Sequence, residues 1–105
     1  MAAGPVMVTV RFTVAASKEP EFLTAMQALR AVRRRTGASS WELYRDAEHR
    51  QRFVEVFRVP SWDEHLRQHS GRLTATDQEI EEAALACSDP PATADHLLPP
   101  LPVKE

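Results

Sequence analysis

The fold follows most directly from residues 40–69, which read SWELYRDAEHRQRFVEVFRVPSWDEHLRQH. Side chains in segments 40–46 and 52–59 alternate with a period of two and include many aromatic and β-branched residues, which is typical of strands. About five polar residues separate the two segments, and this spacing favours a β-hairpin. Pro60 ends the second strand, because proline has no N–H group to donate to a β-ladder.

A short helix is expected directly after the hairpin. Ser61 and Glu64 form a capping box, in which a serine and an acidic residue three positions later satisfy each other's free backbone N–H groups. The helix would run to about Ser70, and Gly71 would break it.

The last third of the chain is expected to add one more helix and one more strand. A second capping signal, at Thr74 or Thr76, opens a helix that ends near Cys87. Proline becomes frequent after Ser88, and between the prolines residues 94–98 can form a short strand.

Upstream of the hairpin, one strand and one helix are expected. Residues 6–14 alternate with a period of two and are rich in valine and threonine. The helix begins with Ser17 as its N-cap and carries Pro20 in its first turn. Three arginines, residues 33–35, close the helix, and Gly37 ends it in the left-handed conformation. We interpret these arginines as capping and solvated residues rather than as an RNA-binding patch.

The expected elements follow the order β-α-β-β-α-(α)-β, the split βαβ pattern of ferredoxin-like folds. We therefore predict the α+β class, with a four-stranded antiparallel sheet and helices packed on one face. The chain is expected to be a single domain, residues 1–105, with an ordered core of about 6–98 and a proline-rich C-terminal tail over 99–105.

Composition excludes several classes of protein. The net charge of -2 argues against a nucleic-acid binder, because the field of the whole chain would repel phosphate. Charged residues interrupt every apolar stretch, so no segment is expected to insert in a membrane, and the N-terminus lacks the pattern of a signal peptide. The single cysteine, Cys87, excludes an internal disulfide framework and a multi-cysteine zinc site. We expect a cytoplasmic protein.

The sheet face without helices points to a homodimer. This face would carry Met7, Thr9 and one side of the hairpin, and both sides of the hairpin hold large apolar side chains. An exposed apolar patch of that size is rare in a monomer. A second sheet packed face to face would cover it, and coverage by the proline-rich tail is the alternative.

Four segments together are similar to a known family: the strand VTVRF, the helix ending in RRRTGA, the hairpin SWELYRD…RFVEVFRVPSW and the helix EHLRQH. Over residues 6–98 they resemble the antibiotic biosynthesis monooxygenase-like family of dimeric α+β barrels. More narrowly, they resemble the soluble domain appended to one group of bacterial major-facilitator exporters, here expected as a free-standing copy. The resemblance implies a homodimer, with a pocket in each subunit between the sheet and its helices.

The resemblance also implies chemistry. Some members of the family oxidise phenolic aromatic compounds with molecular oxygen and without metal or flavin, whereas others degrade haem or oxidise quinols. An acid frequent on the third strand of the family matches Glu55, if a one-residue bulge near Pro60 is allowed. A frequent histidine of the following helix matches His69 under the same shift. The residue set of the haem-degrading branch is not evident, so haem is not expected.

Three side chains of the helix after Pro60 share one face, because Trp62, His65 and His69 are spaced i, i+3 and i+7. A histidine exchanges a proton near neutral pH, and an indole can form the wall of an aromatic pocket. We expect a pocket that Trp62 walls and into which His65 or His69 projects. The alternative is that Trp62 only anchors the helix and the histidines are solvated.

Glu55 lies between Phe53 and Phe57 on one strand face, so its carboxylate, once covered, must find a cation or take up a proton. Three strand arginines are candidates for that cation: Arg11, Arg45 and Arg58. Glu55 would serve either as a general base or hydrogen-bond acceptor for a substrate hydroxyl, or as half of a buried ion pair.

The functional hypothesis is a cofactor-independent monooxygenase that acts on an aromatic or polyketide-like substrate. The residues assigned to catalysis are His69, His65 and Glu55, and those assigned to substrate binding are Trp62, Phe53, Phe57, Arg11 and Arg58. No cofactor is expected, because the chain has no flavin phosphate loop and its two-histidine helix lacks an evident third metal ligand. The alternatives are a non-catalytic ligand-binding or regulatory module and a cyclase or isomerase on the same barrel.

Overall fold

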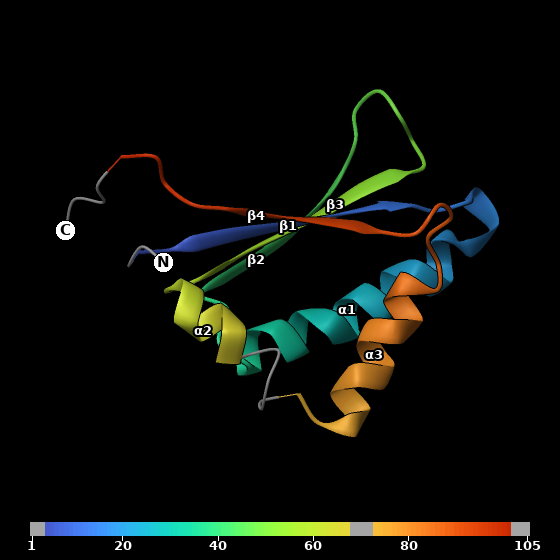
Figure 1. Cartoon of the computed structure of the whole chain (residues 1–105). Coiled ribbons are helices and arrows are strands. Elements are labelled where there is room, and N and C mark those ends of the chain that lie inside the picture. The colour runs from blue at the N-terminus through green and yellow to red at the C-terminus, as the bar shows by residue number, and fades with distance from the viewer. Residues whose placement is uncertain (1–3, 68–72, 102–105) are drawn as a thin grey trace.

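Four antiparallel strands and a layer of helices make up the structure, a computed structural model that describes residues 4–67 and 73–101 (Figure 1). The elements are β1 (Val6–Thr13), the 3-10 turn η1 (Ala16–Lys18), α1 (Glu19–Arg35), β2 (Ser40–Arg45), β3 (Arg52–Val59), α2 (Trp62–Arg67), α3 (Ala75–Leu85) and β4 (Thr93–Leu97). This order confirms the predicted α+β pattern, including the hairpin and the last short strand.

The sheet has the strand order β2-β3-β1-β4, and every neighbouring pair is antiparallel. Val10 of β1 lies opposite both Glu55 and Ala94, so alternate residues of all four strands point to the same side. The helices lie on one side of the sheet and leave the other side uncovered (Figure 1). We call these two sides the helix-side face and the open face.

The hydrophobic core fills the space between the helix-side face and α1. The buried residues of β1 are those of the predicted alternation, from Val6 to Phe12, and α1 buries a stripe that includes Met26 and Leu29. Phe22 joins the two layers, because its ring centroid lies 5.0 Å from the centroids of both Phe12 and Phe53.

The start of α1 differs from the prediction, whereas its end agrees with it. Ser17 does not cap the helix: it lies in the 3-10 turn, and the N-cap is Lys18, which makes no side-chain cap. Pro20 occupies the first turn as predicted, since its missing N–H group needs no partner there. Gly37 has a φ of 127°, as expected for the residue that ends the helix.

The interpretation of the three arginines as capping and solvated residues is wrong for Arg33. Arg33 is only 8% exposed, because its position continues the inward stripe of α1, whereas Arg34 is exposed. Arg35 forms an ion pair with Asp77 of α3. Arg33 and Arg35 therefore hold the end of α1 to its neighbours.

Of the two predicted caps of α3, Thr74 is the one that the structure shows, in a capping box with Asp77. The Asp77 N–H group donates to the Thr74 hydroxyl at 3.1 Å, and the Thr74 N–H group donates to the Asp77 carboxylate at 3.0 Å. The Arg35 guanidinium and the Thr74 N–H group hold the pKa of Asp77 below its ordinary value. The cap and the ion pair therefore meet at one carboxylate.

We expect Thr74→Ala to lower the free energy of unfolding by about 1 kcal/mol, because the first turn of α3 loses its N-cap acceptor. Thr76→Ala, two positions further on an exposed site of the same turn, is the matched control and should change stability little. Urea denaturation measures both variants, and equal losses would contradict a capping role for Thr74.

Candidate functional site

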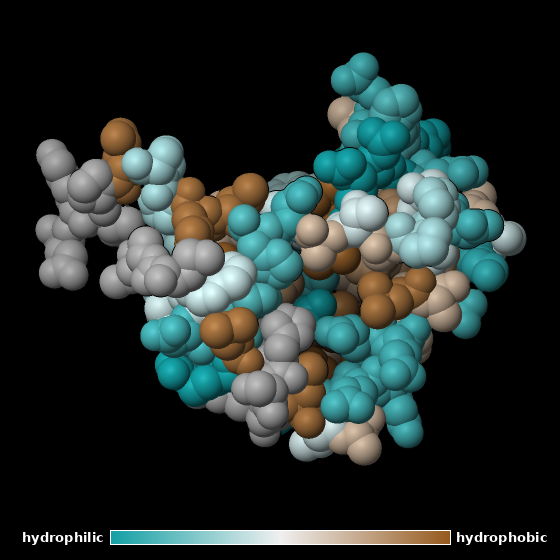
Figure 2. Space-filling view, in the orientation of Figure 1, coloured by the Kyte–Doolittle hydropathy of each residue, from teal (hydrophilic) through white to brown (hydrophobic). Residues whose placement is uncertain are grey.

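A cavity of about 380 Å³ lies between the helix-side face and the helices. Its apolar lining comes from Val8, Val10, Phe57, Leu85, Ala92 and Ala94, and its polar lining from Arg33, His65, Glu81 and His96. In the space-filling view (Figure 2), hydrophobic and hydrophilic side chains are interspersed on the side of the molecule that carries the helices. The volume of the cavity falls within the range of small-molecule sites.

Local structure accounts for the position of His65. The Glu64 N–H group donates to the Ser61 hydroxyl at 3.1 Å, which fixes the start of α2 at Trp62 as predicted. One turn later His65 is 4% exposed and lines the cavity. His69, the other histidine expected on this face, lies outside the described residues.

His65 belongs to an aromatic cluster with Trp62 and His96. The centroid of the His65 ring lies 4.6 Å from that of His96 and 5.6 Å from that of Trp62, and Trp62 lies 5.9 Å from His96. Trp62 is half-buried and packs against the core, but it is not among the residues that line the cavity. Trp62 therefore packs against the two histidines that line the cavity and does not itself form one of the cavity walls.

Sequence reasoning left the role of His96 undetermined. Its strand, β4, has only five residues, and the sequence around His96 contains no motif that would mark a site. The register with β1 sets its position, because His96 lies opposite Val8, whose side chain lines the cavity.

A buried charge network forms another wall of the cavity. Glu55 is 0% exposed and accepts from Arg33 Nε at 3.0 Å and from the Trp41 indole N–H group at 2.8 Å. Arg33 Nη1 in turn donates to Glu81 of α3 at 2.8 Å. Charge-assisted bonds of this kind are the strong ones, so four elements meet at one guanidinium and one carboxylate.

The predicted cationic partners of Glu55 are wrong, since Arg33 takes that place. Successive side chains of a strand point to opposite faces of the sheet. Arg11 and Arg58 therefore lie on the open face and cannot reach the carboxylate of Glu55 on the helix-side face. Arg45 shares the face of Glu55 but binds Glu19 at 2.8 Å.

Of the remaining assigned residues on β3, only Phe57 reaches the cavity. Phe57 lines the cavity, whereas Phe53 packs against Phe22 in the core and does not line it. Glu55 lies behind Arg33 rather than at the cavity surface. Cys87 is buried, and burial raises the pKa of its thiol, which disfavours the reactive thiolate.

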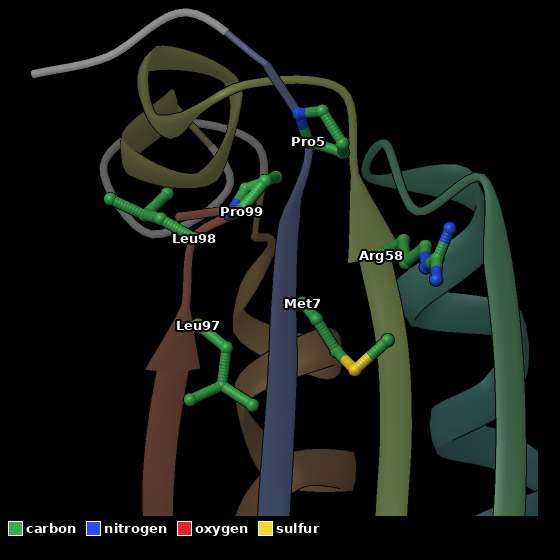
Figure 3. A pocket seen from close by; sticks show the side chains of 6 residues that line it. All are labelled: Pro5, Met7, Arg58, Leu97, Leu98 and Pro99. Carbon is green, nitrogen blue, oxygen red and sulfur yellow. The ribbon is translucent and has the colours of Figure 1, made fainter. Parts of the chain in front are cut away.

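Arg58 lines a smaller pocket of about 240 Å³ on the open face. The other lining residues are Pro5, Met7, Leu97, Leu98 and Pro99. Figure 3 shows Met7 and Leu97 on the neighbouring strands β1 and β4, with Leu98 and Pro99 where the chain leaves β4. This pocket is separated from the helix-side cavity by the sheet.

Two general features bear on the kind of site. Within residues 4–67 and 73–101, no three His, Cys, Asp or Glu side chains come together as a metal-ion site would require. In the same part of the chain, none of the helices combines the length and the apolar character needed to cross a bilayer.

In comparison with known families, residues 1–98 match the family described as transmembrane secretion effector. Comparison with curated proteins gives no match.

Solved structures with the same fold come from several bacteria. A provisionally named antibiotic biosynthesis monooxygenase from Bordetella bronchiseptica is 23% identical, with a TM-score of 0.76, 93% of this chain covered and 99% of that one. A similarly named protein from Nitrosomonas europaea is 14% identical, with a TM-score of 0.78 and coverages of 99% and 98%. SnoaB of Streptomyces nogalater, described as a cofactor-independent oxygenase, is 19% identical, with a TM-score of 0.76 and coverages of 98% and 100%. The predicted resemblance is confirmed at the level of the fold.

We expect Glu55→Gln to lower the free energy of unfolding by roughly 3 kcal/mol, because the fully buried carboxylate that pairs with Arg33 becomes a neutral amide and only the partly exposed Glu81 remains as an anionic partner. Glu48→Gln, at an exposed position in the hairpin turn, removes the same charge and should have almost no effect. Thermal or urea unfolding compares the two variants. Equal stabilities would show that the network does not hold the helices to the sheet.

Proposed function

The chain belongs to the transmembrane secretion effector family, and from this premise we propose that it is a domain that binds a small aromatic or polyketide-like molecule and oxidises it with molecular oxygen. The observation that carries the proposal is the helix-side cavity, where apolar walls meet two imidazole rings and a guanidinium. The fold shared with a protein described as a cofactor-independent oxygenase supports the choice of reaction.

The proposed reaction needs a deprotonated substrate in a largely apolar site. His65 takes the proton of a phenolic hydroxyl, and the phenolate passes one electron to oxygen. The resulting radical and superoxide combine to form a C–O bond, and the peroxide takes up a proton and loses water to leave a quinone. One oxygen atom ends in the product and the other in water, so atoms and electrons balance without a further reductant.

The other residues have supporting roles in this proposal. Phe57 supplies a wall, and Trp62 holds the ring of His65 in place by packing against it. Glu55 acts as a positioning residue, because it orients Arg33 through two hydrogen bonds. The sequence-based assignment of His69 stays a prediction, to be tested beside His65.

A ligand-binding or regulatory module without turnover is the second candidate. The family match favours it, since a domain of a secretion family can bind the transported molecule without changing it. Both candidates use the same cavity, and oxygen consumption separates them.

We expect oxygen uptake when the protein is mixed with 1-naphthol or anthrone, with a quinone as product. His65→Gln should slow this uptake by about 10²- to 10⁴-fold, the usual cost of losing a proton-transfer group. His69→Gln in the same assay tests the second histidine.

His49→Gln, in the exposed hairpin turn, is the control and should keep the full rate. A melting temperature for each variant separates lost chemistry from lost folding. Binding of 1-naphthol without any oxygen uptake would favour the regulatory module, and an unchanged rate in His65→Gln would remove that residue from the reaction.

We also propose that two copies pair through their open faces. The apolar side chains on this face include Met7, Val54 and Val56, which are half-buried, and Tyr44 and Leu97, which are about half exposed. A second copy would cover them, as expected for an apolar patch of this kind.

Sedimentation at micromolar concentration should therefore give the mass of a dimer. Val56→Lys should shift the protein to a monomer, because it puts a charge in the middle of the paired faces. Ala47→Lys, in the exposed hairpin turn, should leave the dimer intact. A wild-type monomer would refute the pairing.

A further inference from the structure

We propose that Arg33 Nη1 is the carboxylate-binding group of the helix-side cavity and that Glu81 is an internal occupant which the ligand displaces. The ligand would then be an aromatic carboxylate, with its rings against the apolar walls. This inference rests on the proposed function, because it concerns the same cavity, and it narrows the class of substrate.

The position of Arg33 does not depend on Glu81. Its Nε group donates to Glu55 at 3.0 Å, its Nη2 group lies 3.5 Å from the other oxygen of that carboxylate, and its guanidinium lies 4.7 Å from the centroid of the Phe57 ring. The partner carboxylate is fully buried in β3. These contacts leave Nη1 in place when Glu81 departs.

Glu81 is held less firmly. Its side chain is 24% exposed, and its contact with Arg33 is a single hydrogen bond of 2.8 Å to Nη1. Rotation about its side-chain bonds would carry the carboxylate into water, where it is well solvated. A ligand carboxylate at Nη1 would make the same charge-assisted hydrogen bond, so it can compete with this single contact of Glu81.

Charge balance favours a carboxylate over a neutral ligand at this position. The structure already accommodates two carboxylates on Arg33, one from Glu55 and one from Glu81. A ligand carboxylate that takes the place of Glu81 restores the same arrangement, so no uncompensated charge is buried. A neutral ligand that displaced Glu81 would leave Nη1 without its anionic acceptor.

The rest of the cavity suits the aromatic part of such a molecule. Val8, Val10 and Phe57 form an apolar surface beside the guanidinium, and His65 with His96 supplies ring nitrogens for a hydroxyl group. The expected ligand is therefore a hydroxylated aromatic acid, and a small two-ring acid is a suitable probe.

The experiment compares two probes, 1-naphthoate and 1-naphthol, by calorimetric titration of the full chain. The wild-type protein should bind both. Glu81→Gln should tighten 1-naphthoate about fivefold, because a neutral amide competes less well for Nη1, and should leave 1-naphthol unchanged. Glu82→Gln removes the same charge from an exposed position of α3 and should change neither affinity.

Arg33→Lys gives a second test, since it keeps a positive charge near Glu55 but lacks the forked donor. It should weaken 1-naphthoate at least fivefold more than it weakens 1-naphthol, with melting temperatures confirming that the variant is folded. If Glu81→Gln and Glu82→Gln tighten 1-naphthoate equally, the effect is one of net charge and the inference fails.

The outcomes also separate this inference from the proposed function. Oxygen uptake with 1-naphthol, together with no effect of Glu81→Gln on either probe, would overturn the role of Glu81 and leave the oxygenase proposal standing. Absence of binding by both probes would overturn both.

Discussion

The constraint on which the rest of the structure depends is the buried carboxylate of Glu55. A charge without solvent costs several kcal/mol unless it is paired and hydrogen-bonded, so the fold must bring a cation to this point of β3. Arg33 does so from α1, and Trp41 adds an N–H group from β2. The guanidinium also reaches Glu81 of α3 and forms one wall of the cavity.

The cavity itself follows from the way two layers meet at an edge of the sheet. Over β1 and β3, α1 packs closely and fills the space with apolar side chains. Towards β4, α2 and α3 contribute lining residues, and the described side chains leave a cavity around His65 and His96. The site therefore combines a charged wall from α1 and α3 with an aromatic cluster from α2 and β4.

The proposed chemistry asks the protein for a proton acceptor, an apolar surface and a group that orients the substrate. Only part of this set could be predicted from the sequence. The spacing from Ser61 placed Trp62 and His65 on one helical face, and the structure brings them together with a third ring. His96 could not be found in this way, because its strand shows no local pattern and its neighbours come from β1 and α2.

The sequence by itself determined the elements and their order, because strand alternation, capping boxes and glycine or proline positions act within a few residues of one another. Gly37 ends α1 as predicted, and Thr74, one of the two predicted caps, begins α3, whereas Ser17 does not cap α1. Only the tertiary structure decided which charges meet. Arg33 and Glu55 are 22 positions apart, and their pairing depends on how α1 crosses the sheet and on which face each strand residue occupies. Arg11 and Arg58 have the right charge for Glu55 but lie across the sheet from it, since side chains one position apart in a strand point to opposite faces.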